Sequence, residues 1–453
     1  MNALPLGPGI RPDKRLAAPQ RPSFGEALRF WLKLGWISFG GTAAHLAIMH
    51  DELVERRRWI SNGKFLHALS HCMILPGPEA QQLAIYIGWK LHGKRGGVAA
   101  GTLFVLPSMF VLLALSVVYV RFGSLAWIAA VFDGLKPVVI ALVMVALQRV
   151  ARSALRGPVQ CAVAVAAFAA MFFFDVSLLV VMFGAVVLGI VLGALRPGLL
   201  QHTGETAAEK DEESYYIHHS SMPPEPIPLL KPALKVAASA FFLWLLPLPF
   251  FYIFVSDFHF WRALTLFFTK TAFVTIGGSY TVIPYVAKVT VTKLHWLTRS
   301  QMMDGFALAE TTPGPLIIVV AFVGFLAAYN HFHGSLWMGT LGLVATSFYT
   351  FLPCFLFVFA GAPLVDRTQD KPVIRGVLEL ITSVVVGAIL ELTFFLGKPV
   401  IFPSGVVGLR QLDAISLVWA LLSLLLLQRF KLKIVSLILL GIGFGSIRYF
   451  LGL

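Results

Sequence analysis

Charged residues are scarce in this sequence, since they make up 13% of 453 residues, against about 25% in soluble domains. Hydrophobic residues make up 58%, where a soluble domain has about 45–50%. A soluble globular protein is therefore excluded. A bilayer core about 30 Å thick admits apolar helices of about 20 residues, whose backbone groups bond internally. The chain is predicted to be an all-α polytopic membrane protein.

The residues and motifs of several other protein classes are missing. The three cysteines, Cys72, Cys161 and Cys354, lie in apolar segments without CxxC spacing, so neither a disulfide framework nor a zinc site is predicted. The histidine pairs are His45 with His50, which precedes Asp51, and His67 with His71. The second pair has no acidic or cysteine partner at ligand spacing, and neither pair recurs in the second half, so no metal site is predicted. No glycine loop followed by Lys-Ser/Thr is present, so direct drive by ATP is not expected. We predict no cofactor and no enzymatic activity.

The net charge of +14 suggests nucleic acid in a soluble protein, but here it is explained by the loops between apolar segments. No nucleic-acid partner is predicted, and the partner surface is the lipid bilayer. The N-terminal residues to Ser23 are polar and rich in proline, without a short apolar core and a small-residue cleavage site. A cleaved signal peptide is therefore not expected.

One stretch of the chain occurs twice, at residues 40–78 and 277–315. Each copy opens on a double glycine, has a tryptophan nineteen residues after the first of these glycines, and closes on Pro-Gly-Pro. The offset is 237 residues at each of these landmarks: Gly40-Gly41 and Gly277-Gly278, Trp59 and Trp296, Pro76-Gly77-Pro78 and Pro313-Gly314-Pro315. A constant offset without gaps indicates a duplicated unit.

Apolar runs between charged or Pro/Gly-rich breaks predict about thirteen transmembrane segments. They lie at residues 24–49, 66–90, 97–120, 125–147, 158–174, 176–195, 236–256, 263–287, 304–329, 335–362, 376–396, 414–428 and 434–452. The predicted organisation is a cytoplasmic N-terminal tail (1–23), a first repeat (24–195), a polar linker (196–235), a connecting transmembrane helix (236–256) and a second repeat (263–453).

Corresponding segments lie seven crossings apart, so the two six-segment repeats are predicted to be inverted in the membrane, as in many secondary transporters. Lysine and arginine in the loops number 23 on the side of the N-terminus and 9 on the other. This bias predicts a cytoplasmic N-terminus and an external C-terminus. The exception is the external loop that carries Arg56, Arg57, Arg58 and Lys64.

The two Pro-Gly-Pro motifs, Pro76-Gly77-Pro78 and Pro313-Gly314-Pro315, interrupt apolar segments. Proline removes backbone donors and restricts the preceding residue, so no continuous helix runs through either motif. Broken backbone inside a membrane is tolerated only where protein or a water-filled cavity satisfies it. Helices that start after each break would aim free N–H groups at an anion. We predict a substrate site between broken helices; the sequence leaves open whether these segments are re-entrant or kinked and spanning.

Polar residues near the breaks are the further candidates. Lys33 and Lys270 recur at the same offset and carry the charge that an anion requires, although both could instead snorkel to the interface. Glu79 and Glu310 are candidates for proton coupling, and Glu79 could equally be stabilised in the first turn of a helix. The predicted substrate-binding residues are Lys33, Gly40, Gly41, Pro76, Gly77, Pro78, Gln81, Gln82, Lys270, Gly277, Gly278, Thr311, Thr312, Pro313, Gly314 and Pro315.

These motifs resemble the chromate ion transporter (CHR) family in its long two-domain form. The resemblance rests on Phe39-Gly-Gly-Thr-Ala-Ala-His45, the run from Met49 to Trp59, Leu75-Pro-Gly-Pro-Glu-Ala-Gln-Gln-Leu-Ala84 and Thr312-Pro-Gly-Pro315. It implies a bacterial inner-membrane protein that exports chromate and confers chromate resistance, with sulfate as a similar anion. Thr42 stands where many members have proline, and the second copy reads Ile276-Gly-Gly-Ser279.

Alternatives remain at this stage. A sulfate or molybdate transporter with incidental chromate transport and a passive anion channel fit the same sequence, because these oxyanions share charge and shape. A membrane enzyme that reduces chromate would need a redox site, which the three unpaired cysteines do not offer. The coupling ion, the direction of transport and the oligomeric state, including a homodimer, are left open.

Overall fold

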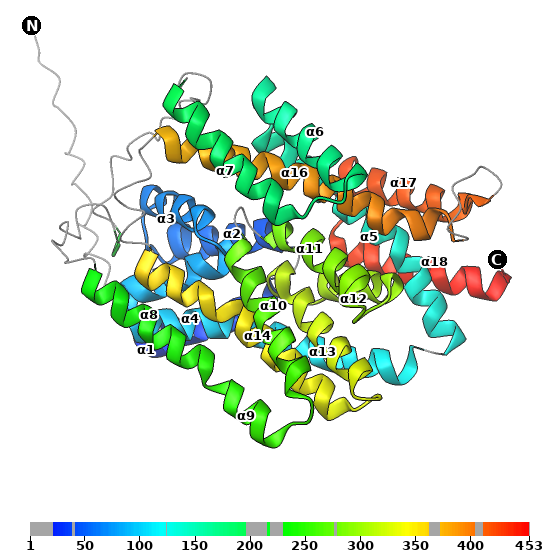
Figure 1. Cartoon of the computed structure of the whole chain (residues 1–453), viewed down its shortest axis with the longest axis horizontal. Helices are drawn as coiled ribbons and strands as arrows, with labels where there is room; N and C mark the ends of the chain where they lie inside the picture. Colours follow the sequence, from blue (N-terminus) through cyan, green and yellow to red (C-terminus); the bar gives the residue numbers. More distant parts are fainter. Residues whose placement is uncertain are drawn as a thin grey trace, which may run out of the picture.

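The computed structural model describes residues 21–38, 41–123, 125–195, 215–217, 230–275, 279–361, 372–403 and 411–452. Within these ranges the chain is helical, and its β-structure consists of one isolated bridge between Ile60 and Ile217 (Figure 1). The all-helical prediction is confirmed for this part of the chain. Most of the predicted tail and most of the predicted linker lie outside the described residues.

The first half forms α1 (Phe24–Ile37), α2 (Gly41–His50), the π-helix η1 (Asp51–Arg56), α3 (Asn62–Ile74), α4 (Glu79–Phe122), α5 (Ala126–Ala154), α6 (Pro158–Phe173) and α7 (Leu178–Leu195). Next come α8 (Leu230–Leu245) and α9 (Pro247–Phe254). The second half forms α10 (Phe258–Val274), α11 (Ser279–Lys288), the π-helix η5 (Val289–Lys293), α12 (Arg299–Thr311), the 3₁₀ turn η6 (Leu316–Ile318), α13 (Val319–His331), α14 (Leu336–Leu356), the π-helix η7 (Phe357–Gly361), α16 (Pro372–Ile401), α17 (Ala414–Gln428) and α18 (Ile434–Leu451).

The same succession of elements follows each double glycine. A short helix passes into a π-helix, and a left-handed residue follows at Arg58 (φ 52°) or His295 (φ 51°). The next helix is α3 in the first half and α12 in the second, and their first residues are 237 residues apart. Both Pro-Gly-Pro motifs follow directly. Gly93 (φ 63°, ψ −162°) divides α4 into two helical arms. The second half makes the same division between α13 and α14.

The predicted segment 24–49 is two helices that fold back on each other. A guanidinium nitrogen of Arg57, beyond the end of η1, lies 3.0 Å from Oε1 of Glu26 in the first turn of α1. The rings of Phe30 and Trp59 are in edge contact at 5.5 Å. The prediction of one continuous segment here is therefore corrected to a hairpin, because α1 ends at Ile37 and α2 and η1 return along it.

The predicted segment 66–90 is also a pair of helices, α3 and the first arm of α4. The arm ends beside the start of α1, where Nε2 of His92 lies 2.9 Å from the carbonyl oxygen of Pro22. The ring of Phe24 contacts the same imidazole at 5.4 Å. Since α3 starts just after Trp59, near the same end of α1, this pair also folds back, and Pro76-Gly77-Pro78 is the point of reversal.

The second half repeats this arrangement in α10–α11 and α12–α13. Nδ2 of Asn330, near the end of α13, donates to the carbonyl oxygen of Trp296, just before α12 (3.0 Å). Nε2 of His331 lies 2.7 Å from Oδ2 of Asp257, just before α10, and Phe260 contacts Trp296. The predicted segment 263–287 is therefore corrected to a hairpin as well, and 304–329, whose form the sequence left open, is also a hairpin.

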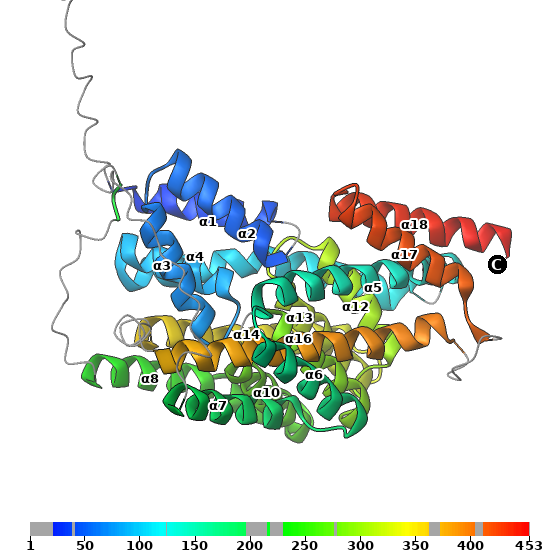
Figure 2. The same cartoon turned by 90° about the horizontal axis from the view of Figure 1, so that it is seen from above.

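Six further helices form a framework in which helices of each half pack on a helix of the other half. α5 and α16 pack against each other; α6 and α7 of the first half pack on α16, while α17 and α18 of the second half pack on α5. Figures 1 and 2 show α6 and α7 alongside α16, and α17 and α18 alongside α5. We call α5, α6, α7, α16, α17 and α18 the scaffold.

Small residues allow the scaffold helices to approach closely. A Cβ on Gly445 of α18 would lie 2.1 Å from the carbonyl oxygen of Ala130 on α5, and Gly134 lies against Gly445 in the same contact. Such glycine contacts are typical of helix packing in membranes. Seven helices of the described residues are long and apolar enough to cross a membrane: Glu79–Phe122, Ala126–Ala154, Leu178–Leu195, Lys231–Phe254, Leu336–Gly361, Gly376–Ile401 and Ile434–Leu451.

A pair of substitutions on one helix tests this packing. Gly445→Val should lower the thermal stability of the detergent-purified protein, because overpacking costs about 1–3 kcal/mol and the atoms it meets are backbone. Gly443→Val is the control, since a Cβ there meets nothing within 4 Å. Equal unfolding temperatures for the two variants would show that the α5–α18 contact does not limit stability.

Candidate functional site

The tip of each Pro-Gly-Pro hairpin is a left-handed glycine between two prolines. Gly77 has φ 126° and Gly314 has φ 117°, a conformation that a side chain strongly disfavours. The flanking prolines lack a backbone donor and cannot continue a helix. The one N–H group within each motif therefore belongs to the glycine.

Each of these N–H groups bonds to the other half of the protein. The N–H of Gly77 donates to the carbonyl oxygen of Thr275, where α10 ends (2.6 Å), and the N–H of Gly314 donates to the carbonyl oxygen of Ser38, where α1 ends (2.8 Å). Both glycines and both acceptors are related by the offset of 237. The hairpin tips of the two halves therefore meet in two crossed and equivalent pairs.

A polar side chain from a long helix closes over each tip. A Cβ on Gly314 would lie 2.0 Å from Oγ of Ser108 on α4, and one on Gly77 would lie 2.8 Å from Sγ of Cys354 on α14. Both side chains are fully buried. They were not among the predicted residues, although Leu106-Pro107-Ser108 and Leu352-Pro353-Cys354 form a second paired motif. The two copies of this motif are 246 residues apart, so they do not align at the offset of 237 that relates the other paired motifs.

Helices begin at the breaks and present their N-terminal ends there. α4 follows Pro78 and η6 follows Pro315, and no side chain caps either start. α2 begins at Gly41 and α11 at Ser279, after the other two breaks. The first N–H groups of a helix have no partner within it, and the helix dipole favours a negative charge beside them. The tips are therefore suited to an anion.

Buried amide groups lie beside the first-half tip, and a buried hydroxyl lies at the second-half tip. Gln82 donates from Nε2 to the carbonyl oxygen of Pro76 (2.5 Å), and Gln81 donates to that of Gly101 (3.2 Å). Both glutamines are at most 1% exposed, and their Oε1 atoms have no hydrogen-bond partner. The Oγ of Ser108 also lacks one. Buried polar groups without partners are costly, which makes them candidates for contact with water or substrate.

The predicted threonines are engaged within their own helix. The hydroxyls of Thr311 and Thr312 both donate to the carbonyl oxygen of Leu308, each at 2.7 Å. In this arrangement neither hydroxyl proton is directed to an anion. Thr312 is buried beside Pro313, and Thr311 is half-buried.

Lys33 and Lys270 lie on the exposed sides of α1 and α10. Their neighbours Leu34 and Thr271 face the interior, so the helical period turns both ammonium groups away from it. This placement favours the alternative that both lysines snorkel to the interface. Their contribution to a positive electrostatic field at the substrate site stays a prediction.

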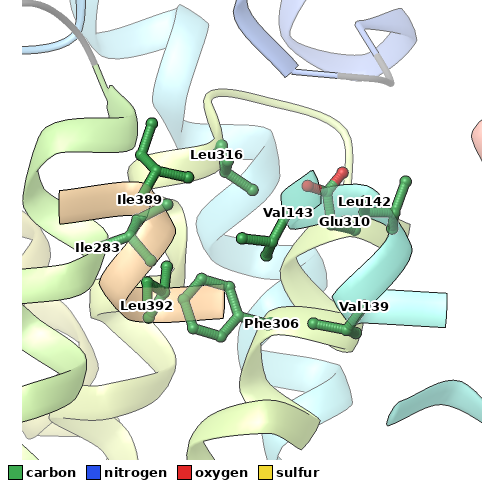
Figure 3. A pocket seen from close by; sticks show the side chains of 9 residues that line it. All are labelled: Val139, Leu142, Val143, Ile283, Phe306, Glu310, Leu316, Ile389 and Leu392. Carbon is green, nitrogen blue, oxygen red and sulfur yellow. The ribbon is translucent and has the colours of Figure 1, made fainter. Parts of the chain in front are cut away.

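The two glutamates occupy different places at the tips. Glu79 is the first residue of α4 and is half-buried. Glu310, in the last turn of α12, lines a small cavity between α5, α11, α12 and α16, with room for about one water molecule. Figure 3 shows its carboxylate beside Val143 and Leu142, as the only ionisable group among the nine labelled side chains. Their proposed role in proton coupling stays a prediction.

Three of the predicted glycines, Gly40, Gly277 and Gly278, lie outside the described residues, and Gly41 is the first residue of α2. No group of three or more metal-ligating side chains is found in the described part of the chain.

The comparison with known families gives two matches in this chain. The sequence model described as "Chromate transporter" matches residues 25–190 and 262–446. The chain belongs to the chromate transporter family. Its long form is confirmed by the two matched segments, which cover most of each half. Membership in this family also makes the chain a transporter and not an enzyme, as the sequence predicts.

Several curated relatives match along most of their length. A chromate transport protein of Pseudomonas aeruginosa is 30% identical over 82% of this chain and 81% of its own. A chromate transport protein of Cupriavidus metallidurans is 27% identical over 82% of both chains. A probable chromate transport protein of Synechococcus elongatus is 26% identical over 86% of this chain and 89% of its own. No solved structure matches this chain.

The crossed tips predict a strong effect of a single methyl group. Gly314→Ala forces a side chain into φ 117° and against Ser108, and should reduce chromate transport by about fivefold to a hundredfold, since strain of this kind costs roughly 1–3 kcal/mol. The measurement is chromate uptake per folded protein in membrane vesicles. Gly397→Ala is the control, because its Cβ would lie 3.9 Å from the nearest atom. Unchanged transport in Gly314→Ala would remove this tip from the transport path.

Proposed function

We propose that this protein is a secondary transporter that exports chromate from the cytoplasm across a bacterial inner membrane and thereby confers chromate resistance. The observation that carries the proposal is the crossed pairing of the two Pro-Gly-Pro tips, at which uncapped helix N-termini converge. The family supplies the substrate class, because the matched relatives are described as chromate transport proteins.

The chemistry of the tips suits a tetrahedral dianion. Backbone N–H groups at helix starts donate to oxyanions without a full positive charge, so the substrate is bound and also released. Buried Gln81, Gln82 and Ser108 add polar contacts in the same region. An inside-negative potential favours outward movement of a dianion by about 2.3 kcal/mol per charge per 100 mV. Export therefore does not require proton coupling through Glu79 or Glu310.

The hairpins define the membrane topology that we propose. Contacts between the two ends of each hairpin bring its start and its end to the same side, so a hairpin does not cross the membrane. We therefore propose four re-entrant hairpins and nine crossings in place of thirteen. The crossings are the second arm of α4, α5, α6, α7, α8–α9, α14, α16, α17 and α18.

This topology keeps the predicted sides of both termini and the inversion of the two halves. The first-half hairpins enter from the cytoplasmic side and the second-half hairpins from outside, so that their tips meet within the membrane. The loop with Arg56, Arg57, Arg58 and Lys64 moves inside, and the loop with Lys288, Lys293 and Arg299 moves outside. The count of basic residues changes from 23 against 9 to 24 against 8, and the exception to the positive-inside rule moves to the smaller loop.

Cysteine labelling separates nine crossings from thirteen. In a background without native cysteines, Glu55→Cys should be protected from a membrane-impermeant thiol reagent in intact cells, whereas His295→Cys should react. Both residues are exposed, so protection reflects the side of the membrane. A cysteine in the linker at Ser220 is the internal control. Labelling of Glu55→Cys together with protection of His295→Cys would support thirteen crossings instead.

The transport test uses everted membrane vesicles energised by respiration. Chromate uptake should saturate and stop when an uncoupler is added. Gln82→Glu should reduce it at least about tenfold, because a carboxylate beside the tip opposes a dianion by more than 1.4 kcal/mol. Gln301→Glu is the control, since glutamate can keep the capping box of α12 while adding the same charge.

Two results would contradict the proposal. Uptake that does not saturate and does not accumulate chromate would indicate a passive channel. Sulfate or molybdate uptake far faster than chromate uptake, with chromate only a weak competitor, would indicate a carrier of those anions.

A further inference from the structure

Lys288, at the end of α11, ties the second-half hairpins to the scaffold. Its Nζ lies 2.7 Å from Oδ1 of Asp175, in the turn between α6 and α7, and 2.7 Å from Oε1 of Glu391 on α16. It also donates to the carbonyl oxygen of Met171 (3.3 Å). The hydrogen bond from Lys288 lowers the pKa of the Asp175 carboxyl, so that this group remains ionised at neutral pH.

The second-half hairpins are docked on the scaffold over a wide surface. α11 packs against α16, and α12 packs against α5, α16 and α18. Every residue of α12 from Met302 to Ala309 is buried. The one space found along this face of α12 among the described residues is the cavity beside Glu310, which has room for about one water molecule.

The first-half hairpins are not docked in this way. α2 and α3 pack chiefly on α1, η1 and α4, which are parts of their own half. Leu66 on α3 is 40% exposed, whereas its counterpart Met303 on α12 is 1% exposed. Ser70 is exposed where its counterpart Ala307 is buried. The described residues therefore leave uncovered on α3 the face that α12 buries against the scaffold.

The residues that correspond to the Lys288 ion pair carry exchanged charges. At the offset of 237, Lys288 corresponds to Asp51, the first residue of η1 directly after α2. Asp175 corresponds to Lys431, because each lies in the turn before the last helix of its half and each is left-handed, with φ 51° and φ 49°. Asp51 is now paired with Arg56 of its own π-helix (3.0 Å), and Lys431 is exposed.

We propose that Asp51 and Lys431 form a second ion pair, which holds the first-half hairpins against the scaffold when the Lys288–Asp175 pair is open. This inference rests on the proposed transport function. In the arrangement described here the outer side is latched and the cytoplasmic side is uncovered. An exchange of conformations between the two halves would dock α3 in the way that α12 is docked now. The Lys288–Asp175 pair would stabilise one arrangement and the Asp51–Lys431 pair the other.

Paired cysteines test whether the two latches alternate. In a background without Cys72, Cys161 and Cys354, one variant carries Asp175→Cys with Lys288→Cys and another carries Asp51→Cys with Lys431→Cys. We expect a short bifunctional thiol reagent to cross-link both variants in membranes, and each cross-link to stop chromate uptake until it is cleaved. Chromate on the outer side should raise the yield of one cross-link and lower that of the other.

Two outcomes would overturn the alternation. One is the absence of the 51–431 cross-link under every condition in which the 175–288 cross-link forms. The other is quantitative formation of both cross-links in the same molecule when all four cysteines are present. Cross-linking does not depend on which anion is carried. If the wild-type protein takes up no chromate, the proposed function is contradicted, while the cross-linking yields still show whether the two ion pairs alternate.

Charge exchange tests the pairing by rescue. Asp51→Lys should slow chromate uptake about tenfold, a typical size for coupling between two states, because it places like charges together in the docked form. Asp51→Lys combined with Lys431→Asp should restore the rate to within about twofold of wild type, with equal amounts of folded protein. Glu55→Lys, which alters an exposed carboxylate on the same π-helix, is the control. A double variant as slow as the single one would contradict the ion pair.

Discussion

The structure depends on the requirement that backbone polar groups inside a membrane find partners within the protein. Pro-Gly-Pro breaks a helix and leaves its glycine N–H free, and a helix that stops at Ser38 or Thr275 leaves a carbonyl oxygen free. Each half of the protein supplies the group that the other half needs, through Gly77 with Thr275 and Gly314 with Ser38. Neither half can satisfy its own breaks in this way, so the two repeats form one unit.

The same constraint explains why the site relies on backbone donors and not on lysine. A break that ends one helix starts another, and the new helix turns its free N–H groups and its positive dipole end toward the tips. A full positive charge at this depth would be costly to bury and would hold a dianion tightly. Lys33 and Lys270 lie instead on the exposed faces of α1 and α10. Weak, distributed donors fit a protein that must release its substrate on the far side.

The sequence predicted the duplication, the helical class, the family and the two Pro-Gly-Pro breaks. It did not predict the hairpins, because a run such as 66–90 has the length and hydropathy of a single crossing, and only contacts such as His92 with Pro22 show that its ends lie together. Nor did it identify Ser108 and Cys354, since a longer connection before α14 changes the offset from 237 to 246. The lysines recur in register, but recurrence does not reveal which face of a helix points inward.

The central claim is that chromate binds where the hairpin tips of the two halves meet. The most direct test is the position of chromium in crystals of the protein grown with chromate, located by its anomalous scattering. We expect a chromium peak among the starts of α2, α4, α11 and η6, near Gly77 or Gly314. Chromium bound only elsewhere, with the tips in their crossed arrangement and without anion density, would contradict it.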